Sequence, residues 1–205
     1  MQNNLNKYYN KGDIEAGIDE AGRGPLIGPV YAAAVILDPD MELHEWLNDS
    51  KKMSRKRREI VREFVEENAV MYAVASEDEK VIDKVNILNA TYSAMHRTLD
   101  NLGIEPDHII IDGNRFIPYI TENGEYIPYT CIIGGDSKYA SICAASVLAK
   151  ENHDDYIKSL CEQYPELDDR YGLLSNMGYG AQKHMDGIRK YGVSRFHRKS
   201  FRPCK

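Results

Sequence analysis

The sequence contains no long hydrophobic run. Nowhere in its 205 residues does an apolar stretch approach the roughly 20 residues that a membrane-spanning helix needs. The first residues, MQNNLNKYYNKGD, lack the apolar centre of a secretory signal peptide. Internal repeats, low-complexity tracts and linkers are also absent. We therefore expect a cytoplasmic protein, without a membrane partner, that folds as one compact unit.

Cysteine pairs are missing as well. The four cysteines are scattered, with no C-x-x-C pair and no histidine at ligand spacing: Cys131, Cys143, Cys161 and Cys204. This pattern argues against a zinc site and against a disulfide framework. We expect the cysteines to act as small apolar residues.

Acidic residues are absent from the last part of the chain. After Asp186 there is no Asp or Glu, but seven basic residues follow: Arg189, Lys190, Arg195, Arg198, Lys199, Arg202 and Lys205. Because the formal net charge of the whole chain is −6, residues 1–186 carry −13. The basic end could be a solvated tail, which composition alone favours, or a phosphate-binding edge beside an acidic metal site.

The chain does contain a clear order of strands and helices. Strands are predicted over residues 15–19, 30–37, 70–75 and 108–111, and Asn123-Gly124 predicts a hairpin between residues 116–120 and 126–133. Helices are predicted from Ser54 to about Asn68 and over residues 87–102, 138–160 and 181–191, with a loop over 165–180. The first two strands form a hairpin, and helices and strands then alternate. This order predicts an α/β fold, a mixed sheet with helices packed on it.

Four acids occupy similar positions relative to the predicted strands. Asp19 and Glu20 close an apolar strand, Asp112 ends another, and Asp136 follows Gly134-Gly135 before a long helix. Ligands collect at strand ends in open sheets, and clustered carboxylates repel each other unless cations bind. Oxygen ligands without His or Cys favour Mg²⁺ or Mn²⁺. Taken singly, Asp112 is more typical of a turn and Asp136 of a helix N-cap, so the prediction depends on the joint pattern.

Two such ions about 4 Å apart would form a phosphoryl-transfer site, in which one generates hydroxide and the other stabilises the leaving oxygen. The turn Gly22-Arg23-Gly24 follows the first acids directly. Glycines let backbone N–H groups approach a phosphate or a ribose hydroxyl, and the arginine adds further donors. A lone G-x-G is a weak signal, so this turn gains meaning only from its neighbours.

Six segments together resemble one known family. GIDEAGRGPLIGPV, NDSKKMS, IIIDG, GGDSKYASICAASVLAK, NMGYG and FHRKSF occur in the order found in ribonuclease HII, the type 2 ribonucleases H, from about residue 14 to 202. The resemblance implies a ribonuclease H-like mixed five-stranded sheet flanked by helices, with a small helical C-terminal extension. It implies a single catalytic domain over residues 1–205, with a core of about 13–160 and a helical, basic part of about 161–205. Type 3 relatives carry a substantial N-terminal substrate-binding domain, whereas only about a dozen residues precede the first predicted strand here, so we expect type 2 to be the better match.

The resemblance also implies an activity. Members of the family hydrolyse the RNA strand of RNA–DNA hybrids and incise duplex DNA on the 5′ side of an embedded ribonucleotide, giving 5′-phosphate and 3′-hydroxyl ends by two-metal-ion catalysis. Carried over by position, Asp19, Glu20, Asp112 and Asp136 would be the catalytic, metal-binding carboxylates. Gly22, Arg23 and Gly24 would recognise the ribose 2′-hydroxyl, and Tyr179 would stack on the following deoxyribose. Lys51 and Lys138 resemble phosphate contacts, with solvated lysines as the equal alternative; His184 resembles a family position but equally fits a packing role.

The sequence departs from the family pattern at three places. Ala181 stands where threonine is usual, residues 115–133 form a longer hairpin, and PELDDR at 165–170 resembles an acidic insertion. Two other hypotheses stay open: a nuclease for branched DNA or a phosphotransferase for small nucleotides on the same fold, and a non-catalytic hybrid-binding module. The choice between Mg²⁺ and Mn²⁺, the preferred substrate, and docking onto a replication clamp are not settled by the sequence. A monomer is expected.

Overall fold

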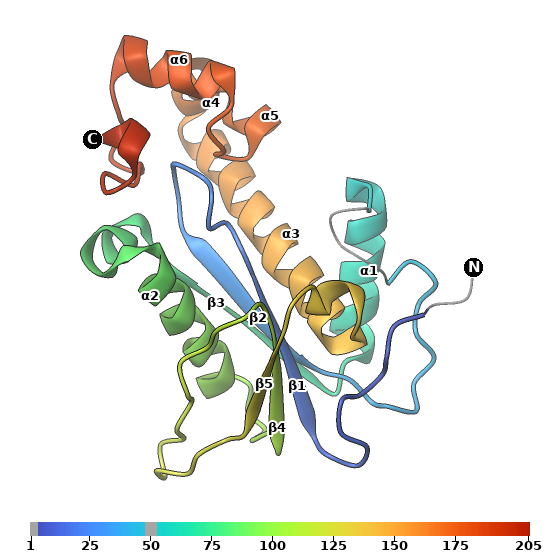
Figure 1. Cartoon of the computed structure of the whole chain (residues 1–205). Helices are drawn as coiled ribbons and strands as arrows, with labels where there is room; N and C mark the ends of the chain where they lie inside the picture. The colour runs from blue at the N-terminus through green and yellow to red at the C-terminus, as the bar shows by residue number, and fades with distance from the viewer. Residues whose placement is uncertain (1–3, 48–52) are drawn as a thin grey trace.

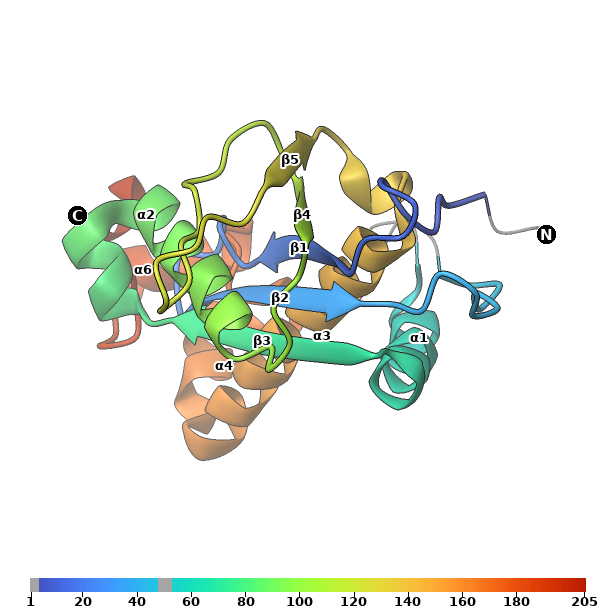
Figure 2. The same ribbon diagram turned by 90° about the horizontal axis from the view of Figure 1, so that it is seen from below.

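A five-stranded mixed sheet lies at the centre of the computed structural model, which describes residues 4–47 and 53–205 (Figure 1). Its strands are β1 (Glu15–Ala21), β2 (Val30–Ile36), β3 (Met71–Glu77), β4 (His108–Asp112) and β5 (Tyr129–Ile132). They lie in the order β3-β2-β1-β4-β5, which Figure 2 shows along the sheet. β2 is antiparallel to β1 and β3, whereas β4 is parallel to β1 and β5. The mixed sheet and the first hairpin are as the sequence predicted.

Helices cover both faces of the sheet. They are α1 (Arg55–Asn68), α2 (Glu79–Asp100), α3 (Ala140–Gln163), α4 (Pro165–Tyr171), α5 (Leu173–Asn176) and α6 (Gln182–Tyr191), with 3-10 turns η2 (Gly135–Ser137) and η3 (Arg202–Cys204). Alternation along β2 divides the core. Ala32 and Ala34 pack with residues of α2, whereas Ala33 and Val35 pack with α1 and α3 on the opposite face. None of the helices in the described ranges is both long and apolar enough to cross a membrane.

The start of α3 lies unusually close to β1. A Cβ atom at Gly17 would come within 2.4 Å of the carbonyl carbon of Ser141, so only glycine fits at this point of the strand. The first turns of α3 are buried and rich in small residues, among them Ala140, Cys143 and Ala144. Small side chains on both elements therefore set the spacing between the helix and the strand that carries Asp19.

The last helices pack around the C-terminal half of α3. A separate apolar cluster joins Ile157 and Leu160 of α3 to Leu167 and Tyr171 of α4 and to Ile27, in the loop between β1 and β2. In Figure 1 these helices form the red end of the molecule beyond the sheet. The segment after α6 returns to the same loop, because His197 forms a β-bridge with Ile27. The C-terminal part of the chain is thus attached directly to the loop that follows the first acids.

Three predicted elements differ from the structure. Residues 116–120 are not a strand, since one isolated bridge, Ile120 to Tyr126, stands in place of the predicted hairpin ladder, and β5 instead pairs parallel with β4. The predicted loop over 165–180 contains α4 and α5. The helix predicted over 87–102 begins earlier, at Glu79, where the Asp78 carboxylate accepts hydrogen bonds from two backbone N–H groups.

Candidate active site

Three of the predicted acids meet at one cleft. Asp19 and Glu20 lie near the end of β1, and Asp112 is the last residue of β4. Ile18 pairs with Ile111 in the parallel ladder, so Asp19 and Asp112 are the next residues along adjacent strands. All three line a cleft of about 390 Å³. The sequence prediction placed Asp19 at the strand's end, whereas β1 continues through both acids to Ala21.

Asp19 is the most buried of these three acids, with 4% of its surface exposed. Burial, followed by the negative charges of Glu20 and Asp112, raises the pKa of Asp19 well above its ordinary value. Hydrogen bonds from the Ser146 hydroxyl and the Glu20 backbone N–H partly offset this effect. The site therefore crowds carboxylates in a place where negative charge is poorly solvated.

The other two acids in the cleft have local partners. Glu20 Oε1 lies 3.0 Å from Arg23 Nη1, and Asp112 Oδ1 accepts a hydrogen bond of 2.7 Å from the Gly135 backbone N–H. That second bond links β4 to η2, the turn that carries Asp136. Asp136 is itself buried, at 3% exposure, but it does not belong to the described cleft lining. The structure thus brings three predicted acids into one cleft and places the fourth beside it.

The donor chemistry of the cleft fits a hard divalent cation, because all its candidate ligands are carboxylate oxygens. Within the described residues, however, no three His, Cys, Asp or Glu side chains are already grouped as a metal site. Glu20 would have to leave Arg23 to join Asp19 and Asp112 around a cation. The residues of the cleft therefore fit a divalent ion in their chemistry.

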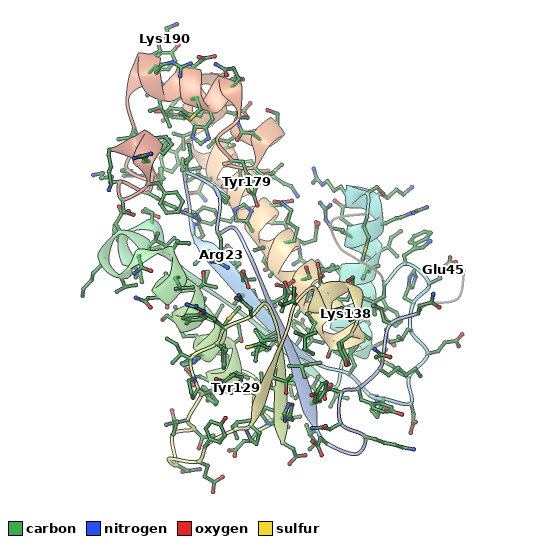
Figure 3. The ribbon with its side chains drawn as sticks, viewed as in Figure 1. Arg23, Glu45, Tyr129, Lys138, Tyr179 and Lys190 are labelled. Carbon is green, nitrogen blue, oxygen red and sulfur yellow. The ribbon has the colours of Figure 1, made fainter. Side chains whose placement is uncertain are left out.

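The predicted ribose-reading residues line the same cleft. Gly22, Arg23 and Gly24 follow β1 directly, and Tyr179 lies in the loop before α6. A Cβ atom at Gly24 would lie 3.1 Å from Tyr179 Cε1, so the turn and the aromatic ring are in contact. Arg23 and Tyr179 both line the cleft, and Figure 3 labels them toward the end of the sheet from which α3 rises to the last helices. Tyr179 lines the cleft and is 42% exposed as a residue.

The two predicted lysine contacts are not part of the described cleft. Lys51 lies outside the described residues. Lys138 is exposed beside η2, its Nζ donates a hydrogen bond of 2.6 Å to the Ile133 carbonyl, and Figure 3 shows it well away from Tyr179. His184, by contrast, is fully buried, with Nδ1 3.0 Å from the Tyr179 carbonyl oxygen and Nε2 3.1 Å from His197 Nε2. This environment favours the packing role for His184.

Three further residues line the cleft that the sequence reasoning did not single out: Arg58, Ser146 and Lys150. Ser146 and Lys150 are four residues apart on α3 and therefore share one face of that helix. Lys150 Nζ lies 2.6 Å from Asp154 Oδ1 and 5.9 Å from the centre of the Tyr179 ring. The helical spacing within GGDSKYASICAASVLAK could have identified both α3 residues. Arg58 comes from α1, far away in the sequence, and had no such signal.

Comparisons with known proteins point to one family. The family model described as Ribonuclease HII matches residues 16–204. The ribonuclease HII of Christiangramia forsetii is 48% identical over 195 residues, covering 95% of this chain and 93% of the relative. A solved structure titled as the PCNA:RNase HII complex from Archaeoglobus fulgidus has a TM-score of 0.72 at 24% identity and covers 90% of this chain and 93% of its own. The crystal structure of Bst-RNase HIII in complex with Mn²⁺ has a TM-score of 0.64 at 22% identity. It covers 93% of this chain and 67% of its own chain.

The two solved structures support the fold. The family match and the 48% identical relative also support the activity. The match spans nearly the whole chain, including both strands that carry the cleft acids, the turn Gly22-Arg23-Gly24 and the segment around Tyr179. These findings favour the enzymatic hypothesis over a non-catalytic binding module. The chain belongs to the ribonuclease HII family of endoribonucleases.

Proposed function

We propose that this member of the ribonuclease HII family, a family that hydrolyses the RNA strand of RNA–DNA hybrids, also incises duplex DNA on the 5′ side of a single embedded ribonucleotide. The observation that carries the proposal is the composition of one cleft. Asp19, Glu20 and Asp112 line it together with the turn Gly22-Arg23-Gly24 and Tyr179. Groups suited to phosphate hydrolysis thus lie beside groups suited to reading a sugar.

The acids supply the hydrolytic half of the proposal. Asp19, Glu20 and Asp112 would hold divalent ions, with Asp136 adding a carboxylate from the adjoining turn η2. When bound, Mg²⁺ or Mn²⁺ activates water and stabilises charge on the leaving oxygen. Glu20 would exchange its ion pair with Arg23 for a cation, which leaves the Arg23 guanidinium available for a phosphate. Water adds to phosphorus, the P–O3′ bond breaks, and the products carry a 3′-hydroxyl and a 5′-phosphate.

The turn Gly22-Arg23-Gly24 and Tyr179 would recognise the sugar of the substrate. Only the 2′-hydroxyl distinguishes a ribonucleotide from a deoxyribonucleotide in this setting, and it both donates and accepts a hydrogen bond. Gly22, Arg23 and Gly24 line the cleft, and their backbone groups would meet such a hydroxyl. The Tyr179 ring touches the position of a Gly24 side chain and is partly exposed, as stacking on the next sugar requires.

Basic residues complete the proposed substrate contacts. Lys150 and Arg58 line the cleft, each paired with a carboxylate: Asp154 for the lysine and Glu151 for the arginine. Lys138 and Lys51 are retained as proposed phosphate contacts outside the described cleft. A replication clamp is retained as a proposed partner, since one structural relative is titled as a complex with PCNA.

The 2′-hydroxyl itself provides the test. A labelled DNA duplex with one ribonucleotide is compared with the same duplex bearing a 2′-O-methyl or a 2′-deoxy group at that position. We expect incision 5′ of the ribonucleotide and none of the other two duplexes, because neither offers the hydroxyl donor. Hydrolysis of a long RNA–DNA hybrid without incision of the single-ribonucleotide duplex would contradict the proposal, as would equal cutting of the 2′-O-methyl duplex.

A further inference from the structure

Arg198 is the one arginine in the basic C-terminal segment whose side chain is fully buried in the described structure, at 0% exposure. Its guanidinium donates four hydrogen bonds to backbone carbonyl oxygens rather than to an acid. Nε reaches Gly28 at 2.8 Å, Nη1 reaches Arg23 at 3.1 Å, and Nη2 reaches Gly22 at 2.7 Å and Pro29 at 2.9 Å. The sequence predicted that the basic end is either solvated or binds phosphate, and neither role fits this buried side chain.

Two of these hydrogen bonds fix the orientation of the turn that lines the cleft. In a trans peptide the C=O and the following N–H point in opposite directions, and the described chain contains no cis peptide. Because the Gly22 and Arg23 carbonyls point toward the guanidinium, the N–H groups of Arg23 and Gly24 point away from it. Arg198 is buried, whereas residues 22–24 line the cleft, so the two N–H groups are oriented toward the cleft side.

These two N–H groups also have no hydrogen-bond acceptor within residues 4–47 and 53–205. No backbone or side-chain acceptor is recorded for the amides of Arg23 or Gly24 in the described part of the molecule. Adjacent N–H groups that point the same way form a concave donor site for an oxygen ligand. On the other side of the turn, a Cβ at Gly22, where φ is +85°, would lie 2.5 Å from His153 Cδ2, so the turn has little room to move.

The residue before Arg198 supports the neighbouring wall of the cleft. His197 Nε2 lies 3.1 Å from His184 Nε2, and His184 Nδ1 lies 3.0 Å from the Tyr179 carbonyl oxygen. The backbone N–H of Arg198 donates to Leu26 O at 2.8 Å, and the Leu26 N–H donates to Gly178 O at 2.8 Å. One short segment after α6 is thus connected to both the turn and the loop that carries Tyr179.

We propose that Arg198 is a positioning residue for substrate discrimination. By fixing the peptide planes of the turn, it presents the N–H groups of Arg23 and Gly24 to the ribose hydroxyl. Its contribution falls on the choice of ribonucleotide over deoxyribonucleotide, while the carboxylates act on the phosphate. This inference rests on the proposed function, because it assumes that the turn reads the ribose.

The test is a ratio of affinities, which does not depend on the fraction of folded protein. The association constant for a duplex with one ribonucleotide is divided by the association constant for the all-DNA duplex of the same sequence. Both are measured in an Asp112→Asn background, which prevents cleavage of the substrate. Arg198→Lys keeps the charge but cannot reach four carbonyls in a fixed fork. Arg198→Met removes the charge, and Arg202→Met is the matched control because Arg202 is an exposed arginine of the same segment. If Arg198→Met fails to fold, Arg198→Lys decides.

We expect wild-type Arg198 to give a ratio well above one, and the Lys and Met variants to lower it by roughly tenfold or more, as for a displaced positioning group. Arg202→Met leaves the ratio unchanged. If the wild type is selective and both Arg198 variants give a ratio within twofold of the wild-type ratio, the inference is overturned, whereas the proposed function still stands. A wild type without selectivity would instead overturn the proposed function, and this inference with it.

Discussion

Asp19 is a buried carboxylate beside two others, and in the metal-free protein this arrangement is destabilising. The Asp19→Asn variant removes one negative charge while its amide oxygen can still accept the hydrogen bond from the Glu20 N–H. We predict that the variant cleaves no RNA–DNA hybrid yet melts a few degrees higher than wild type in the presence of a chelator, corresponding to about 1–2 kcal/mol. A lower melting temperature with full cleavage would refute both parts.

Tyr179 provides a prediction about substrate choice. Its exposed ring contacts the Gly22–Gly24 turn. Among the described residues, no contact joins this ring to the three acids that line the same cleft. Tyr179→Ala should therefore lower kcat/KM for a single-ribonucleotide duplex about tenfold more than for a long hybrid, which is the lower end of the roughly 1–3 kcal/mol that stacking of a base on an aromatic ring contributes. The control is Tyr126→Ala, another exposed tyrosine, which does not line the described cleft. Equal losses on both substrates would speak against stacking at the junction.

At the residue scale, the acids of the cleft could be predicted from the sequence, but the residues that hold the cleft in shape could not. Asp19 and Asp112 could be placed together because apolar strands lead into both. Arg198 could not be placed, because a basic tail gives no sign that one of its charges is buried against backbone carbonyls. Arg58 was missed for a similar reason: it reaches the cleft from α1, and its partner Glu151 is 93 residues away.

At the element scale, the strands were easier to predict than the first half of α2. Asn86 has φ of +69° and interrupts that helix, and its side-chain oxygen accepts hydrogen bonds from the N–H groups of Leu88 and Asn89. It therefore acts as an N-cap inside one continuous element. The apolar periodicity restarts after it, which explains why the sequence predicted a helix from residue 87 only.

The close approach of α3 to β1 predicts a strict requirement at Gly17. In Gly17→Ala the new methyl group would overlap the Ser141 backbone, so the helix must shift away from the strand that carries Asp19. We expect a loss of about 1–3 kcal/mol in the free energy of unfolding, seen as a melting temperature lower by several degrees. Gly180→Ala is the control, because its Cβ would meet only ordinary contacts, the nearest at 3.4 Å. Equal melting temperatures for the two variants would contradict this packing.

For the whole molecule, the buried histidine pair predicts a loss of stability in mild acid. Burial, reinforced by His184, lowers the pKa of His197 to about 4, and burial also lowers the pKa of His184; Tyr171 is the other titratable group against them. Between that value and the ordinary histidine pKa near 6.5, the unfolded chain binds more protons than the folded one. This stability is therefore fully present above about pH 6.5 and is lost as the pH falls toward 4.

Urea unfolding between pH 4.5 and 7.5 measures this effect. Wild type should lose up to about 1.4 kcal/mol per pH unit from His197 alone, in addition to its carboxylates. His197→Gln should be less stable at pH 7 and show a shallower slope. Parallel slopes for the two proteins would show that His197 does not titrate in this way.

The charge of the whole molecule is also easier to interpret with the fold in view. Composition separated an acidic body from a basic end, but residues 194–198 are packed against the loop that follows β1. Removing residues 194–205 would delete Arg198 together with the exposed charges, so such a truncation cannot report on phosphate binding alone. Substitutions at exposed positions such as Arg202 separate the two effects.

The most direct test of the account is metal-dependent incision of a labelled DNA duplex that carries one ribonucleotide. Wild type and Asp112→Asn are incubated with Mg²⁺, with Mn²⁺ and with chelator, and the product ends are mapped. We predict a cut 5′ of the ribonucleotide, leaving a 3′-hydroxyl and a 5′-phosphate, only with a divalent ion and only in wild type. Incision by Asp112→Asn at the wild-type rate, or incision in chelator, would contradict the central claim that these carboxylates form the active site.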